Sequence, residues 1–438
     1  MKIKFPFLLS ILFWSSITLA QNDYAKLDSL FTLLESNNKF MGSVAISEGG
    51  KILYSKSVGI TDLYTKKRAT NATKYRIGSI SKMFTSVMIF KAVEENKLTL
   101  DQTIEAYFPS VPNAKKITIS HLLNHRSGIY NITNSGDYWK YYTQPKTQAE
   151  MVAFIAKTKS DFEPDSKADY SNSNYILLSY ILEKVYKKPF GDILTEKITK
   201  PLNLKNTYLG NRINLGKNEC YSFTYTEEWT TEKETDPSIP LGAGAIVSNP
   251  TDLTLFIESL FAGKIISKKS LDQMTTIKDN FGMGIFQLPF DQRKGFGHTG
   301  GIDGFSSSLG YFPDSNVSVA LTSNGNNFDN NQIMIALLST YYAIPFEMPS
   351  FKTVALTEEE LDKYLGNFAS EELAMTIKVT RKANTLYAQA TGQSEFPLDA
   401  TKADTFEFLA AGIKLKFDLA NQQMTLHQGG KSFIFRKL

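Results

Sequence analysis

The stretch Arg76-Ile77-Gly78-Ser79-Ile80-Ser81-Lys82-Met83-Phe84-Thr85 determines how the rest of this sequence is interpreted. It predicts a turn and then the first turns of a helix, which continues through the apolar residues 87–90. Ser79 and Lys82 stand three positions apart and would share one helix face. A serine hydroxyl needs a neighbouring base to become a good nucleophile, and an amine is one such base. The N–H groups at the start of a helix would also be available to an oxyanion.

The same pattern fits an ordinary surface helix. Ser-x-x-Lys occurs a second time, at Ser36 and Lys39, in a polar stretch typical of a helix end. Ser79 as a helix N-cap, with Lys82 as a solvated charge, is therefore the alternative to a catalytic pair. Residues elsewhere in the chain have to decide between the two.

Composition sets broad limits on function. The chain has 438 residues, of which 42% are apolar and 21% charged, and its net charge is +4. This is globular composition with room for one large and one small domain. The charge is too nearly balanced to indicate nucleic acid or a polybasic membrane anchor as a partner.

The first twenty residues have the pattern of a secretory signal peptide. Lys2 and Lys4 precede a short apolar core, and residues 18–20 are suited to cleavage before Gln21. The apolar run is short for a membrane span, so we expect no span after signal removal. Cys220 is the single cysteine, which rules out an intramolecular disulfide. We expect a periplasmic or secreted bacterial protein that is stabilised by its core.

The chain divides into a large α/β part and a small β part. Helical patterns at 24–35, 79–96, 118–124, 149–157, 174–186, 250–261 and 332–342 combine with strand patterns at 42–47, 51–55, 282–288, 295–298, 305–312 and 317–323. The short connections predict a mostly antiparallel sheet flanked by helices, with a helical subdomain. We expect this domain at 21–345, a linker at 346–358, and a small all-β antiparallel domain, sheet or barrel, at 359–438.

Two further stretches supply what a nucleophilic serine requires. Tyr170-Ser171-Asn172 is the only Tyr-x-Asn in the chain and pairs a phenol that can transfer a proton with an orienting amide. His298-Thr299-Gly300 ends a predicted strand, where glycine would let a substrate backbone lie along the strand edge.

Ser79-x-x-Lys82, Tyr170-x-Asn172 and His298-Thr299-Gly300, in this order, resemble the serine β-lactamase and penicillin-binding-protein family, in its class C branch. The flanking stretches at 121–128, 162–164, 242–244 and 297–301 agree with it. The resemblance covers roughly residues 23–345. Residues 364–368 resemble the opening of the lipocalin-like β-domains that follow this catalytic domain in many bacterial homologues. For the C-terminal domain we favour the role of a stabilising appendage, with packing, substrate gating and dimerisation as the alternatives.

The resemblance implies a role for each residue. Ser79 would form the acyl-enzyme, Lys82 would be the general base or keep Tyr170 basic, and Tyr170 would pass the proton to the leaving group and activate water. Asn172 would orient Lys82 and the substrate amide.

The remaining motif residues would form the substrate site. The backbone N–H groups of Ser79 and Gly301 would form the oxyanion hole. His298, Thr299 and Gly300 would bind the substrate and its carboxylate.

The departure from the β-lactamase pattern is His298, where those enzymes usually have lysine. An imidazole offers less fixed positive charge to a penicillin carboxylate. The combination is more similar to DD-carboxypeptidases, D-aminopeptidases and esterases of the same fold. We expect a serine hydrolase acting on D-amino-acid peptides, amides or esters. A class C-like β-lactamase and a non-catalytic penicillin-binding or sensor protein are the alternatives.

No cofactor or metal is expected. His121 and His125 have a possible ligand spacing, but no third ligand is near, so both are interpreted as hydrogen-bonded structural histidines. The expected partner is a small-molecule or peptide substrate, and the sequence defines no oligomeric state. Residues 131–144 and 211–240 should control substrate selectivity.

Overall fold

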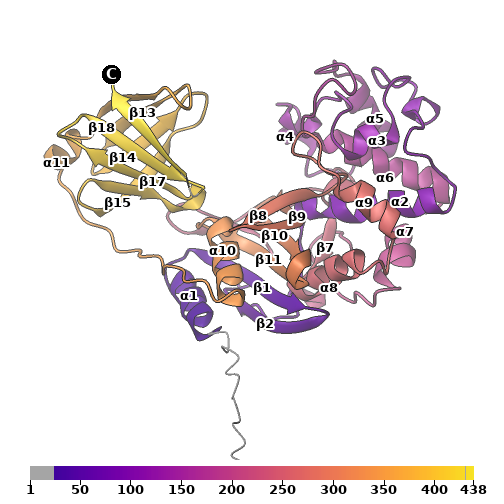
Figure 1. The fold of residues 1–438 in the computed structure, drawn as a ribbon, viewed down its shortest axis with the longest axis horizontal. Coiled ribbons are helices and arrows are strands. Elements are labelled where there is room, and N and C mark those ends of the chain that lie inside the picture. The colour runs from indigo at the N-terminus through magenta and orange to yellow at the C-terminus, as the bar shows by residue number, and fades with distance from the viewer. Residues whose placement is uncertain (1–23, 430) are drawn as a thin grey trace, which may run out of the picture.

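The computed structural model describes residues 24–429 and 431–438, and Figure 1 shows their arrangement. The predicted signal peptide lies outside the described residues. A sheet occupies the middle of the molecule, a helical region lies at one end and a β-barrel at the other. Within the described residues, every helix is too short or too polar to cross a bilayer.

The central sheet has its strands in the order β2-β1-β11-β10-β9-β8, each antiparallel to the next. Two short strands extend it, since β5 pairs with β11 in parallel and β6 pairs with β5. The strands are β1 (Phe40–Glu48), β2 (Lys51–Val58), β5 (Phe223–Tyr225), β6 (Trp229–Thr231), β8 (Phe286–Phe290), β9 (Arg293–Ile302), β10 (Phe305–Phe312) and β11 (Val317–Asn326).

Helices cover both faces of the sheet. Successive residues of a strand point to opposite faces, so the central strand β11 contributes residues to two cores. Val319 and Leu321 of β11 pack with α1 (Tyr24–Ser36) and α10 (Asn330–Tyr341) on one face. Ala320 belongs to the core of the other face, which α8 (Pro250–Phe261) covers. The prediction of a helix-flanked antiparallel sheet is confirmed.

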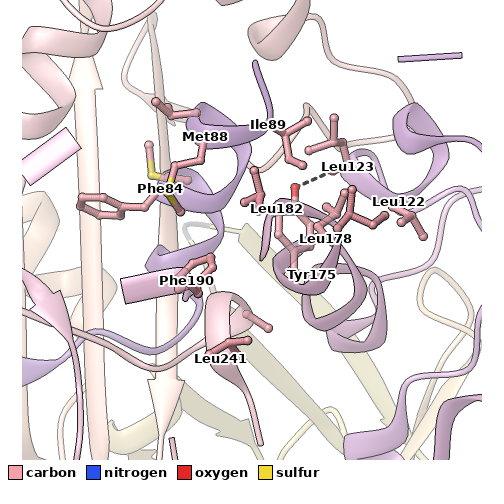
Figure 2. Close-up of a cluster of buried hydrophobic side chains, with 14 of the residues drawn as sticks. Phe84, Met88, Ile89, Leu122, Leu123, Tyr175, Leu178, Leu182, Phe190 and Leu241 are labelled. Carbon is pink, nitrogen blue, oxygen red and sulfur yellow. Dashed lines mark hydrogen bonds between the residues drawn. The ribbon is translucent and has the colours of Figure 1, made fainter. Parts of the chain in front are cut away.

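The helical region is built around two buried helices, α2 (Ser81–Glu94) and α6 (Asn172–Tyr186). Figure 2 shows their apolar side chains filling the space between them, with the Tyr175 hydroxyl donating to the carbonyl of Leu123 at 2.7 Å. The Phe84 ring stacks on Phe256 of α8 with centroids 3.8 Å apart, which fixes α2 against the sheet side. The other helices here are α3 (Ile119–Leu123), α4 (Tyr138–Tyr141), α5 (Gln148–Ala156), α7 (Phe190–Leu194) and α9 (Lys268–Thr275).

A small three-stranded sheet leads the chain into α2. Its order is β3 (Tyr75–Arg76), β7 (Ile246–Ser248) and β4 (Tyr208–Leu209), all antiparallel. Residues Gly78–Ile80 then form one 3-10 turn before α2 begins. Ser79 therefore stands in this turn and not within the helix that the sequence predicted.

The C-terminal part is a closed antiparallel barrel. It follows residues 342–357, which contain no helix or strand, and α11 (Glu358–Asp362). It contacts the rest of the chain at α10, where the Asp329 amide donates to the Leu409 carbonyl at 2.9 Å. Its strands are β12 (Gly366–Ser370), β13 (Met375–Lys382), β14 (Thr385–Ala390), β15 (Phe396–Lys402), β16 (Thr405–Phe408), β17 (Ile413–Asp418), β18 (Gln423–Gln428) and β19 (Lys431–Lys437).

The predicted strand at 282–288 begins too early. Residues 282–285 form a tight turn, closed by the Gly282 amide on the Ile285 carbonyl at 2.9 Å, and β8 starts only at Phe286. Gly284 has φ +79°, which an extended strand does not allow.

Candidate active site

Ser79 sits in the turn between β3 and α2, and its neighbour Gly78 makes that turn possible. Gly78 has φ +50°, in the left-handed region. A Cβ atom on Gly78 would also lie 2.7 Å from the amide nitrogen of Gly301. The turn that carries Ser79 therefore packs backbone to backbone against the end of β9, with no room for a side chain between them.

Lys82 lies one turn further on and is fully buried. Its Nζ atom contacts three oxygen atoms: Ser79 Oγ at 2.9 Å, Asn172 Oδ1 at 2.8 Å and the Ala243 carbonyl at 2.7 Å. Burial holds the pKa of the Lys82 ammonium well below its ordinary value. The prediction that Ser79 and Lys82 lie together is matched by the geometry, and Lys82 is not a solvated surface charge.

Tyr170 approaches the same hydroxyl from the other direction. It lies two residues before α6, and its hydroxyl is 2.8 Å from Ser79 Oγ. Burial raises the pKa of the Tyr170 phenol, while the hydrogen bond with Ser79 lowers it. Tyr170 therefore keeps its proton at neutral pH and donates it to Ser79 Oγ.

Asn172 is held on both sides by the segment that follows α3. Its side-chain Nδ2 donates to Thr133 Oγ1 at 3.1 Å, and its backbone amide donates to Asn131 Oδ1 at 3.1 Å. These contacts fix which end of the amide faces Lys82, because the nitrogen is already used. The carbonyl oxygen of Asn172 is thus the end that accepts from Lys82.

The three oxygen partners of Lys82 Nζ limit how its hydrogen atoms can be arranged. The Ala243 carbonyl and Asn172 Oδ1 can only accept hydrogen bonds. The ammonium form donates to all three oxygens, Ser79 Oγ included. In the neutral form, which burial favours, the two acceptor oxygens take both N–H groups and the lone pair faces Ser79 Oγ. In that form Ser79 Oγ accepts from Tyr170 and donates to Lys82, an arrangement suited to deprotonating the serine.

His298 lies on β9 beneath Tyr170, with ring centroids 6.4 Å apart. It is buried, and Nδ1 contacts the Thr299 carbonyl at 2.5 Å, so Nδ1 carries the proton. Burial, and next the charge of Lys82, lower its pKa to about 3, so the imidazole is neutral at physiological pH. Nε2 is buried without a hydrogen-bond partner among the described residues.

The three residues after His298 alternate in direction along β9. Thr299 is exposed and lines a different cavity, which faces α10. A Cβ atom on Gly300 would lie 2.1 Å from the Ile77 carbonyl and 3.0 Å from the Ser79 amide nitrogen. Gly301 is exposed beside Ser79. The backbones of Gly300 and Gly301 therefore lie beside Ser79, whereas the Thr299 side chain points away from the serine.

Ser79 opens into a cavity of about 480 Å³. One wall comes from the segment around α4, and the other from residues 232–244 and the turn between β9 and β10. The lining residues are Ser79, Thr133, Tyr138, Trp139, Tyr142, Asn172, Ile176, Glu232, Lys233, Thr235, Ile239, Pro240, Ala243, Gly244, Gly301, Ile302 and Asp303. Both segments expected to control selectivity, 131–144 and 211–240, contribute to it.

Sequence reasoning missed Arg76. Its buried guanidinium contacts the carboxylates of Asp303 at 3.1 Å and Glu234 at 3.0 Å, and donates to the carbonyls of Thr235 and Asn211. It thereby ties the turn that carries Ser79 to the wall formed by residues 232–244 and the turn between β9 and β10. The sequence feature that could have indicated Arg76 is its position three residues before Ser79, within the same motif-bearing stretch 76–85.

The two histidines of the α3 region have structural contacts. His121 Nδ1 accepts from the Thr118 amide and completes a capping box at the start of α3. His125 is buried, and its Nδ1 accepts from the Ser171 amide at 3.2 Å, next to Tyr170. Among residues 24–429 and 431–438 no group of three metal-ligating side chains is present.

The fold and the serine-centred network together define a serine hydrolase of the kind that includes peptidases, amidases and esterases. The chain belongs to the beta-lactamase family, whose model matches residues 33–339. The predicted membership of the β-lactamase and penicillin-binding-protein group is therefore confirmed.

Three known proteins illustrate its relatives. Penicillin-binding protein 4* of Bacillus subtilis is 25% identical over 94% of this chain and 96% of its own length. Teichoic acid D-alanine hydrolase of Staphylococcus aureus is 28% identical over 69% of this chain and 75% of its own. The structure of a D-stereospecific amidohydrolase from a Streptomyces species is similar with a TM-score of 0.61 and 26% identity, over 69% of this chain and 95% of that one.

Proposed function

We propose that this protein is an exported serine hydrolase that forms an acyl-enzyme on Ser79 and acts on peptides, amides or esters containing D-amino acids. The observation that carries the proposal is the position of Ser79 Oγ between Lys82 Nζ at 2.9 Å and the Tyr170 hydroxyl at 2.8 Å. Export rests on the signal pattern of residues 1–20.

Acylation begins when Ser79 Oγ attacks the substrate carbonyl carbon and its proton moves to the neutral amine of Lys82. The charge that develops on the carbonyl oxygen is stabilised by the backbone N–H groups of Ser79 and Gly301. When the intermediate collapses, the C–N or C–O bond breaks. Tyr170 gives its proton to the leaving group and regains one from Lys82.

Deacylation repeats the chemistry with water in place of the leaving group. Tyr170 and Lys82 take a proton from the water as it attacks the acyl carbon, and the Ser79 oxygen recovers a proton as the ester bond breaks. Asn172 holds Lys82 throughout. The products are a carboxylic acid and free Ser79, so atoms and protons balance.

The D-amino-acid preference is supported by the relatives named as a D-alanine hydrolase and a D-stereospecific amidohydrolase. The class C-like β-lactamase alternative is weakened by His298, since a buried neutral imidazole supplies no positive charge to a penicillin carboxylate. A non-catalytic sensor would not need Lys82 Nζ and the Tyr170 hydroxyl on either side of Ser79 Oγ, so their presence favours turnover.

A fluorescent fluorophosphonate tests the proposal, because it labels only an activated serine. Wild-type protein should be labelled at Ser79, and Ser79→Ala should not be. Ser36→Ala, in the second Ser-x-x-Lys copy, is the matched control and should label like wild type. Absence of label on wild type, or equal labelling of Ser79→Ala, would contradict the proposal. Nitrocefin turnover as fast as amide or ester turnover would favour the β-lactamase.

We further propose that residues 21–345 form the catalytic domain and residues 359–438 an appendage that stabilises it, joined by the linker 346–358. The contact of Leu409 with the start of α10 supports this, as does the Val354 amide, which donates to the Ala400 carbonyl at 2.8 Å. Truncation after residue 345 should lower the melting temperature but leave Ser79 labelling measurable. Unchanged melting would exclude a stabilising role.

A further inference from the structure

The cavity beside Ser79 has an aromatic wall. Tyr138 and Trp139 have ring centroids 5.3 Å apart, and the rings of Trp139 and Tyr142 are also 5.3 Å apart. All three line the cavity. Trp139 is 67% exposed, which is high for so large an apolar side chain. An exposed indole at the mouth of a cavity is available to contact a ligand.

The facing wall is acidic. Glu232 and Asp303 line the same cavity. Burial first, and then the charges of Asp303 and Glu232, raise the pKa of the Tyr142 phenol, so these carboxylates lie near the aromatic wall. The two walls are joined through the Asp236 amide, which donates to the Tyr142 carbonyl at 2.8 Å.

The two carboxylates differ in how they are used. Both oxygens of Asp303 are occupied, by Thr235 and by Arg76. Glu232 accepts from the Thr224 hydroxyl through Oε1, and its Oε2 has no hydrogen bond within the described part of the chain. Glu232 therefore has an oxygen available to a ligand.

Among the described residues that line the cavity, no cation is held in place by packing or hydrogen bonds to bind a substrate carboxylate. Arg76 is outside the lining and engages two carboxylates and two carbonyls. His298 is neutral and buried, and Lys82 is buried behind Ser79. Among the described lining residues the one cation is Lys233, on an exposed, flexible side chain.

We propose that Glu232, with the rings of Trp139 and Tyr142, forms a subsite for a cation, and that it binds the α-ammonium group of an unblocked aminoacyl substrate. An ammonium group is attracted both to a carboxylate and to the face of an aromatic ring. The inference rests on the proposed function and narrows it. The favoured substrates are aminoacyl amides or esters with a free amine, and not acylated peptides ending in a carboxylate.

Two substrates of matched size test the subsite: D-alanine p-nitroanilide, with an ammonium group, and D-lactic acid p-nitroanilide, with a hydroxyl in its place. The measured quantity is the ratio of their kcat/KM values at pH 7, expected to be about tenfold in favour of the amine. If neither is turned over, D-alaninamide and D-lactamide are compared as competitors of fluorophosphonate labelling.

Variants locate the preference. Glu232→Gln should lower the ratio about fivefold, mainly through KM, because a partly exposed ion pair contributes about 1 kcal/mol. Trp139→Ala should lower it about threefold, the effect of one exposed cation–π contact. Glu227→Gln removes an exposed carboxylate that does not line this cavity and should leave the ratio unchanged.

The pH dependence gives a second readout. An α-amino group loses its proton near pH 8, so the ratio should fall as pH rises from about 7 to 9. Lys82 and Tyr170, which carry out the reaction, act on both substrates, so their effect cancels in the ratio. The charges of Glu232, Lys233 and Asp303, with the tyrosines of the cavity, act on the ammonium group that only one substrate carries.

The outcomes separate this inference from the proposed function. Label on Ser79 with equal use of the two substrates, or with a ratio that Glu232→Gln leaves intact, overturns the ammonium subsite and leaves the hydrolase standing. A faster reaction with the acetylated dipeptide acetyl-D-alanyl-D-alanine also overturns it. Absence of any label on Ser79 overturns both.

Discussion

The Nζ atom of Lys82 lies 2.9 Å from the Oγ atom of Ser79, and the lysine side chain is completely buried. Burial disfavours the ammonium form, while the Ala243 carbonyl and Asn172 Oδ1 occupy both hydrogens of the neutral amine. Because its pKa is lowered, Lys82 is available as a base at a lower pH than a solvated lysine.

The rate of Ser79 labelling should therefore depend on the lowered pKa of Lys82. The reactive form is the neutral amine, so the rate should fall as pH falls through that lowered pKa and level off above it. Lys82→Met should label about 10²–10⁴-fold more slowly, the usual contribution of a general base. Labelling rates between pH 5 and 10 check this. A rise centred on the ordinary lysine pKa, near 10.4, would contradict it.

His298 should make the protein sensitive to acid. Its pKa is about 3 in the folded protein and about 6.5 for an exposed imidazole, so between these two pH values the unfolded chain binds up to one proton more. Stability from this group is complete above pH 6.5 and is lost as pH falls toward 3, by roughly 1 kcal/mol per pH unit. The free energy of unfolding of His298→Gln, measured by urea at pH 7 and 5, should fall less than that of wild type. An equal fall would show that His298 does not titrate in this way.

Arg76 should be needed for both stability and activity. Arg76→Ala leaves the buried carboxylate of Asp303 without its cation, which costs about 3 kcal/mol in a buried pair. Because Arg76 also anchors one wall of the cavity beside Ser79, through Glu234, Thr235 and Asp303, labelling should slow even where the protein remains folded. Denaturant unfolding and the labelling rate measure the two effects.

Arg68→Ala is the control for Arg76. The Arg68 side chain is 61% exposed and pairs with Glu35 on the surface, so its removal should change stability by less than about 1 kcal/mol. Similar losses from both arginine variants would contradict the role given to Arg76.

Gly78→Ala should impair the turn that carries Ser79. The left-handed φ of +50° costs a side chain about 1–2 kcal/mol, and the new Cβ atom would press on the Gly301 backbone. We expect slower labelling, with a melting temperature lowered by a few degrees. Gly136→Ala, where φ is not positive and no atom lies within 4 Å of the Cβ position, is the control and should match wild type.

The residues of the network could be named from the sequence because each belongs to a short motif that occurs only once or twice in the chain. Ser79 with Lys82, Tyr170 with Asn172, and His298 with Thr299 and Gly300 occur in one order along the chain. The amphipathic periods likewise gave α1 and α8, whose caps and apolar faces are local properties.

The sequence could not say how these residues face one another. Thr299 follows His298 directly, yet a strand alternates its sides, so the two point into different surroundings. The role of Arg76 could not be predicted, because its partners Glu234 and Asp303 lie more than 150 residues away along the chain. Contacts of that separation leave no periodic signal.

The sequence by itself determined the family, the fold class and the residue types of the site, because motifs and hydrophobic periods are written locally in the chain. Only the tertiary structure decided the burial of Lys82 and His298 and the direction in which their pKa values move. Enclosure by α2, α6 and Ala243 lowers the pKa of Lys82, and burial beneath Phe286 and Tyr170 lowers the pKa of His298. Burial is a property of the assembled fold, and it makes a serine followed by a lysine into a candidate nucleophile beside its base.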